Sequence, residues 1–162
     1  MSDLGSAPVP PLVPDDHVRG GGHDGAPRVV YADYECPYCA VLCQRLAGSG
    51  ERWVFRHFPV KSKHPRAWAA ACAAEAAGLQ GRFWEMHDAL FADQGRLEDP
   101  HLWARAAALG LDVDRFDADR RSDAVAARVR RDFESGIRAG VVTTPTAFGN
   151  GTMQAGPDAA LT

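Results

Sequence analysis

The feature that most constrains the fold is a pair of cysteines placed where an extended segment gives way to a helical one. Residues 28–33 (RVVYAD) form a short β-branched and aromatic run, typical of a buried strand. Cys36-Pro37-Tyr38-Cys39 follows at once, and the next residues are helical in composition until Gly48. Proline suits the first turn of a helix, where its missing N–H removes no bond. The sequence therefore predicts a strand and then a helix whose first turn carries both thiols.

The spacing of the two thiols gives them different expected roles. Cysteines three positions apart at the start of a helix can close a small disulfide, with the first exposed and the second turned inward. Cys36 lies where unpaired backbone N–H groups and the helix dipole favour an anion, and such sites lower a thiol pKa from ~8.5 to ~3.5–7.5. We expect Cys36 to be the nucleophile that forms a mixed disulfide, which Cys39 then resolves.

The rest of the chain predicts one α/β domain with helices inserted between two parts of a sheet. A second strand is expected over 52–58, ended by Pro59. Apolar residues then recur at helical spacing over 83–90, 102–109 and 125–137, with Ser122 as a plausible N-cap and Gly140 just past the end. Residues 143–148 read as a loop entering a strand, and Gly149-Asn150-Gly151 as a hairpin turn into 152–155. A βαβ unit, a helical insertion over about 62–140 and a β-hairpin would give a mixed sheet with helices on its faces.

The two ends of the chain are predicted to be less regular. Prolines and glycines dominate residues 1–25, so we expect a flexible N-terminal arm followed by one domain over 26–162. The tail from Pro157 is too short to predict a firm helix. No basic and apolar leader is evident, which favours a cytoplasmic location in which structural disulfides are rare. A formal net charge of −3 and the lack of a long apolar run favour neither nucleic acid nor membrane as a partner.

Taken together, these segments resemble the DsbA-like branch of the thioredoxin superfamily, in its cytoplasmic form. The matching segments occur in the family's order: VVYADYECPYC, WVFRHFPV, HPRAWAAACAAEAAG, FWEMHDALF and VVTTPTAF. The resemblance implies a thioredoxin fold with a helical insertion, no organic cofactor and no metal. It implies that Cys36 and Cys39 are the redox pair and that Pro145 is a cis-proline, with the Thr144 backbone pairing with bound substrate. Pro37 and Tyr38 are expected to contact protein or small-molecule disulfide and dithiol substrates.

Three other functions remain open at this point. The Pro37-Tyr38 dipeptide is the one found in glutaredoxins, so a glutathione-dependent glutaredoxin or transferase-like enzyme is the main alternative. A zinc-binding or redox-sensing module is the second, in which Cys43 and one of His57, His64 or His87 would complete four ligands. A scaffold that only binds peptides is the third. A shortened C-terminal helix would expose apolar surface and favour a homodimer.

The remaining conspicuous residues have ordinary structural explanations. Cys43 and Cys72 fit small core positions, because free cysteine is among the most buried residue types. Asp33 and Glu35 are expected to form a solvated rim beside the motif, and His57 and His64 to be hydrogen-bonded structural histidines. Aromatic residues at helical positions are expected to lie in the core, namely Phe83, Trp84, Phe91 and Trp103.

Overall fold

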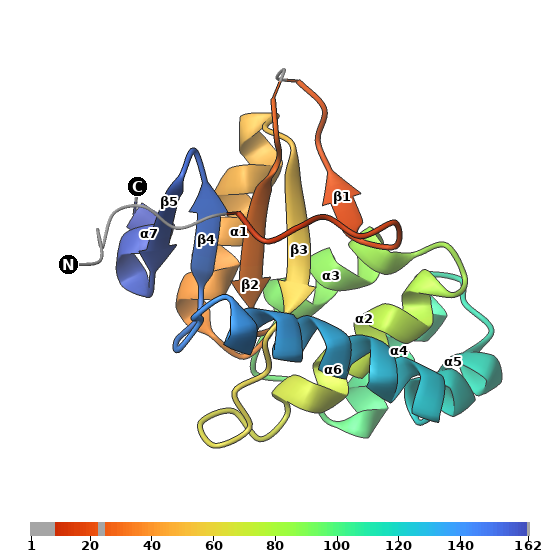
Figure 1. Ribbon diagram of the computed structural model, residues 1–162. Coiled ribbons are helices and arrows are strands. Elements are labelled where there is room, and N and C mark those ends of the chain that lie inside the picture. Colours follow the sequence, from red (N-terminus) through yellow and green to blue (C-terminus); the bar gives the residue numbers. More distant parts are fainter. Residues whose placement is uncertain (1–8, 23–24, 162) are drawn as a thin grey trace.

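The protein folds into one mixed β-sheet with helices on both faces, as the computed structural model shows (Figure 1). The structure describes residues 9–22 and 25–161. Five strands lie in the order β1-β3-β2-β4-β5: β1 His17–Arg19, β2 Arg28–Ala32, β3 Trp53–His57, β4 Thr146–Gly149 and β5 Thr152–Ala155. Strands β2 and β3 are parallel, and the other neighbours are antiparallel. The predicted α/β thioredoxin-like sheet with a helical insertion is confirmed.

Helices connect and cover these strands. Helix α1 (Pro37–Ser49) links β2 to β3, and five helices separate β3 from β4: α2 Ala67–Gly78, α3 Phe83–Ala92, α4 Asp99–Ala108, α5 Val113–Arg120 and α6 Asp123–Arg138. The Ser122 hydroxyl caps α6 by accepting the Val125 N–H at 3.2 Å, as its position in the sequence predicts. The helices of the insertion thus run from Ala67 to Arg138.

The alternation of side chains along β2 divides the core between the two faces of the sheet. Val30 faces a cluster built with α1, α2 and α3, whereas Val29 and Tyr31 face a second cluster that includes Phe133 of α6. Helix α6 can approach the sheet closely because residue 136 is glycine. A Cβ atom there would lie 2.7 Å from the Phe58 ring. The two apolar layers pack against β2 and β3, and the cysteine motif follows closely after β2.

The N-terminal segment corrects one prediction. Residues 9–22 belong to the fold, because β1 pairs with the outer edge of β3, in the register His17 with Phe55. The adjoining loop is held by Arg56, whose guanidinium donates to both Asp16 carboxylate oxygens and to the Pro11 carbonyl. A three-residue strand stabilised by partners 40 residues away has no local sequence signal. Residues 1–8 and 23–24 of the predicted arm lie outside the described residues.

Two further expectations also change. Residues Pro157–Leu161 form a short helix, α7, which packs against α1 with Ala159 and Ala160 fully buried. Trp103 is 38% exposed rather than in the core, and its indole N–H donates to Asp117. Phe83 is buried, while Trp84 and Phe91 are partly buried against the main cluster, as predicted. In the described part of the chain, no helix is long and apolar enough to cross a membrane.

Candidate active site at the start of helix α1

Both cysteines of the motif lie at the N-terminus of α1, as the sequence predicts. Cys36 is the N-cap residue, with extended backbone angles, and its Sγ accepts the Cys39 backbone N–H at 3.4 Å. The Cys36 N–H donates in turn to the Asp33 carbonyl at 3.1 Å. A sulfur therefore occupies the position where a Ser or Asp oxygen usually caps a helix, and it meets the positive end of the helix dipole.

The two thiols are free, lie near disulfide distance and are unequally enclosed. Cys39 is fully buried, and Cys36 retains 4% of its surface, which is less exposure than the sequence predicts for the first cysteine. The Cys36 thiol faces the Thr144 carbonyl oxygen at 3.6 Å, although the two residues are 108 positions apart. Only a small part of Cys36 is thus open to solvent, and the loop that carries Thr144 covers its sulfur on one side.

The surroundings of the two thiols shift their pKa values in opposite directions. The hydrogen bond with the Cys39 thiol lowers the pKa of Cys36 against the effect of burial, with help from the Cys39 N–H and Thr144, to about 6. Burial raises the pKa of Cys39 well above its usual value, and a Cys36 thiolate raises it further. At neutral pH the site therefore holds one thiolate and one protonated thiol, which is the state that thiol-disulfide exchange needs.

The loop before β4 completes the site. The Thr144–Pro145 peptide bond is cis, and Thr144 is 8% exposed. The Pro145 carbonyl accepts the Gly156 N–H at 2.7 Å, and the Thr146 hydroxyl donates to the Thr143 carbonyl at 2.7 Å. These bonds hold the Thr144 backbone against Cys36.

Two exposed residues follow Cys36 directly in the chain. Pro37 and Tyr38 are both exposed, Tyr38 to 47%, so the rim beside Cys36 combines a proline ring with an aromatic ring. An apolar hollow of about 720 Å³ lies among the β3–α2 connection, α6 and the segment just before Thr143. Val142 at its edge is 88% exposed. The hollow adds a sizeable apolar surface that sequence reasoning missed, because its walls come from three separate segments.

Asp33 occupies a different position from the one predicted. It is 1% exposed rather than on a solvated rim, because three hydrogen bonds to its carboxylate satisfy it in the interior. One oxygen accepts the Glu35 N–H, and the other accepts the Val60 N–H and faces His64 Nδ1 at 2.9 Å. The Asp33 N–H points to the Cys39 sulfur at 3.4 Å. Asp33 thus anchors the loop that leads into the motif, a role that depends on long-range partners.

The other three candidates behave as structural residues. Glu35 is half-buried and accepts the Arg66 N–H at 3.2 Å, and burial raises its pKa. Cys43 and Cys72 are 3% and 4% exposed, and burial raises the pKa of both, to about 11 for Cys72. Both therefore stay protonated and unreactive at neutral pH.

Within the described residues, the cysteine pair is not part of the group of side chains that lie close enough together to hold a metal ion. Among residues 9–22 and 25–161, one group of three metal-binding side chains lies close together, and it consists of His17, His57 and Glu75. It contains no cysteine. The predicted zinc alternative, in which Cys43 and a histidine join the pair, is therefore not supported by the arrangement.

Comparison with known proteins agrees with this fold. The profile of one protein family, described as the DSBA-like thioredoxin domain, matches residues 54–160. The structure of a thioredoxin-like oxidoreductase from Silicibacter pomeroyi DSS-3 superposes with a TM-score of 0.78 at 26% identity, over 89% of this chain and 85% of that one. BdbD from Bacillus subtilis superposes with a TM-score of 0.74 over 97% and 92% of the two chains, and at 20% identity it shows the fold alone.

Curated relatives are more similar in sequence but much longer. The chain is 42% identical over 156 residues to a protein named Na(+)/H(+) antiporter NhaA 1 of Mycolicibacterium gilvum, covering 91% of this chain and 25% of the relative. It is 45% identical to Na(+)/H(+) antiporter NhaA 3 of Salinispora tropica, with coverage of 91% and 24%. The chain thus spans about a quarter of the length of these relatives.

Proposed function

Because the chain belongs to the DSBA-like thioredoxin domain family, we propose that it is a thiol-disulfide oxidoreductase with Cys36 as nucleophile and Cys39 as resolving thiol. One observation carries the proposal. Cys36, with a pKa lowered to about 6, lies beside the fully buried Cys39, whose pKa is raised. A ready thiolate paired with a protonated partner favours attack by the first sulfur and release by the second.

The reaction balances without any added cofactor. The Cys36 thiolate attacks one sulfur of a substrate disulfide, forms a mixed disulfide and releases the other substrate sulfur as a thiolate, which takes up a proton. Cys39 then loses its proton and attacks the Cys36 sulfur, which releases the second substrate thiolate. The substrate gains two electrons and the pair becomes a disulfide; the reverse sequence oxidises a substrate dithiol.

We propose disulfides and dithiols of polypeptides as the substrates. The Thr144 backbone beside Cys36, the exposed Pro37 and Tyr38, and the apolar hollow next to the Thr143–Pro145 loop together form a surface suited to an extended chain. Backbone pairing at Thr144 would position the substrate sulfur, and the hollow would accept apolar side chains. Such recognition depends little on the substrate's sequence.

The test combines a redox titration with an insulin reduction assay. We expect a reversible two-electron disulfide that is lost in Cys36→Ser and in Cys39→Ser, with Cys72→Ala as the matched control that retains it. The Cys39→Ser variant should accumulate a mixed disulfide on Cys36. Absence of a reversible disulfide in the unmodified protein would refute the proposal. Turnover with glutathione mixed disulfides but not with insulin would instead support the glutathione-dependent alternative.

We also propose a sodium/proton antiporter of the NhaA type as a partner, because relatives with that name contain a region 42–45% identical to this chain. Trapping with the Cys39→Ser variant tests this directly in cells that contain such an antiporter. A mixed disulfide between Cys36 and an antiporter cysteine, lost in the Cys36→Ser, Cys39→Ser double variant, would support it. Trapping of other proteins without the antiporter would contradict it.

A further inference from the structure

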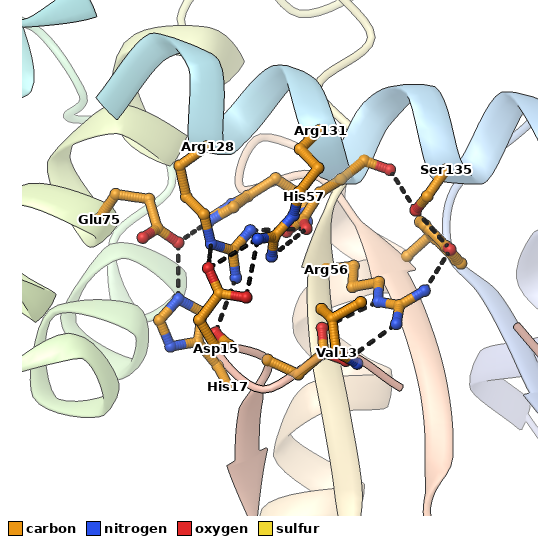
Figure 2. A network of polar contacts seen from close by, with 12 residues as sticks. Val13, Asp15, His17, Arg56, His57, Glu75, Arg128, Arg131 and Ser135 are labelled. Atoms are coloured by element: carbon orange, nitrogen blue, oxygen red, sulfur yellow. Dashed lines mark hydrogen bonds and ion pairs between the residues drawn. The ribbon is translucent and has the colours of Figure 1, made fainter. Parts of the chain in front are cut away.

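Three side chains from three different elements converge on one point away from the cysteine pair. His17 lies in β1, His57 at the end of β3 and Glu75 in α2. The Nε2 atoms of His17 and His57 lie 2.6 Å and 2.8 Å from the same carboxylate oxygen of Glu75. Figure 2 shows both side chains pointing at this oxygen. One ligand atom of each residue lies within 4.8 Å of the others.

The surrounding structure holds these side chains in place. The His17 ring stacks on Phe83, with the ring centroids 3.5 Å apart and the planes inclined by 4°. The His57 backbone N–H donates to the Asp132 carboxylate at 3.0 Å, and the His57 side chain is 1% exposed. Glu75 lies on an α2 face that is buried along most of its length. Preorganised ligands of this kind lose little conformational freedom on binding an ion.

In the described part of the chain, Glu75 forms no ion pair with an arginine, unlike other buried carboxylates of the region. Asp16 and Asp132 form ion pairs with Arg56 and Arg128. Glu75, by contrast, has only the two imidazoles as ion-pair partners in the described part of the chain. The cluster therefore places one carboxylate oxygen between two imidazole nitrogens.

This donor set suits zinc-class ions. Two imidazole nitrogens and one carboxylate are ligands that zinc binds at ~2.0–2.2 Å, with water in the fourth position of a tetrahedron. Ligand atoms around such an ion lie about 3.3 Å apart. The two nitrogens would have to move from the Glu75 oxygen by less than about 1 Å.

Binding also requires each Nε2 to present a lone pair, so the ring proton must be carried by Nδ1. The Nδ1 atom of His57 is buried and has no hydrogen-bond partner within residues 9–22 and 25–161. Moving the proton there breaks no hydrogen bond at Nδ1. The His17 side chain is 18% exposed, which leaves a route from solvent to the cluster.

We propose that His17, His57 and Glu75 form a binding site for one divalent metal ion of the zinc class, with a water molecule as the fourth ligand. The bound ion would join β1 and α2 to the end of β3. The site is separate from the cysteine pair.

The experiment measures zinc binding by the full, tag-free chain with the cysteine pair oxidised, so that Cys36 and Cys39 cannot ligate the ion. We expect one zinc per chain by elemental analysis after gel filtration, and a rise in the unfolding temperature on adding zinc. His17→Ala and Glu75→Gln should each weaken binding at least about tenfold, whereas His101→Ala, an exposed histidine on α4, should leave it unchanged. Glu75→Gln retains an oxygen that can accept the two N–H groups, so its metal-free unfolding temperature reports whether the fold persists.

Cobalt provides a second readout that depends on ligand type. In the Cys36→Ser, Cys39→Ser background, bound Co²⁺ should show the visible bands of a site with nitrogen and oxygen ligands, without sulfur-to-cobalt charge transfer. These bands should disappear in His17→Ala. No stoichiometric zinc in the oxidised protein, or zinc binding that survives Glu75→Gln and His17→Ala unchanged, would overturn the proposal.

Discussion

At the scale of single residues, the reactivity of the pair depends on Cys39 as much as on Cys36. The hydrogen bond with the Cys39 side chain is the largest of the effects that act on the pKa of Cys36, and the Cys39 N–H adds to it. The backbone N–H lowers the pKa of Cys36 whatever residue stands at position 39, because every helix N-terminus offers such groups. The side-chain effect on this pKa depends on which residue stands at position 39. The two contributions can therefore be separated by substitution.

We predict that Cys39→Ala raises the pKa of Cys36 and that Cys39→Ser raises it less, because a serine hydroxyl can still donate to the thiolate. The measurement is the rate of Cys36 alkylation between pH 4 and 10. In the unmodified protein the rate should rise with a midpoint at about 6. An unchanged midpoint in Cys39→Ala would show that the helix N-terminus alone sets the acidity of Cys36.

At the scale of elements, β1 depends on one buried ion pair. Arg56 and Asp16 side chains are 3% and 2% exposed, so removing the carboxylate leaves a guanidinium buried without its partner. We predict that Asp16→Ala lowers the free energy of unfolding by about 3–5 kcal/mol. Asp88→Ala, which breaks the more exposed pair with Arg19, should cost less than about 1 kcal/mol. Urea unfolding of both variants checks this, and equal losses would contradict it.

The contact between α6 and the sheet gives a second prediction for an element. A methyl group at position 136 would meet Phe58 at 2.7 Å and Tyr31 at 3.0 Å, so Gly136→Ala should destabilise by about 1–3 kcal/mol despite the better helix propensity of alanine. Gly48 lies in α1, and a Cβ atom added there would meet no other part of the chain within 4 Å. Gly48→Ala should therefore raise the free energy of unfolding by up to about 1 kcal/mol. Unfolding curves that move in the same direction for both would refute the close packing.

The elements also show which parts of the fold could be predicted from the sequence. The start of α1 and the Gly149-Asn150-Gly151 hairpin turn are encoded by adjacent residues, and the structure agrees with both. Strand β1 and the buried Asp33 could not be predicted in this way. Their stability comes from partners such as Arg56 and His64, which the fold brings from 31 to 40 positions away. Composition around β1 indicated only a flexible segment.

The candidate sites also combine features that the sequence predicts with features that it does not. The pairing of Cys36 with Cys39 follows from their spacing, and the place of Thr144 beside them came from a family resemblance rather than from the residues themselves. The convergence of His17, His57 and Glu75 had no signal in the sequence, because the three residues are separated by 40 and 18 positions and belong to different elements. The roles assigned to Pro37, Tyr38 and Pro145, the cytoplasmic location and the homodimer stay predictions.

At the scale of the whole molecule, the lowered pKa of Cys36 links stability to both pH and redox state. Folding lowers the pKa of Cys36 to about 6, so the reduced protein gains stability as pH rises from about 6 towards the ordinary thiol pKa, and it loses this contribution as pH falls through 6. At 1.36 kcal/mol for each pH unit the full gain is at most about 3 kcal/mol, and solvent screening reduces it. The oxidised protein has no Cys36 thiolate and lacks this contribution.

We therefore predict that the reduced form becomes steadily more stable relative to the oxidised form between pH 6 and pH 8. Guanidinium unfolding of both forms at each pH measures the difference. Cys43 and Cys72 are protonated in both folded forms and so cancel. Above about pH 8.5 the trend should flatten or reverse, because unfolding lets Cys39 ionise only in the reduced chain. A difference independent of pH would show that folding leaves the acidity of Cys36 unchanged.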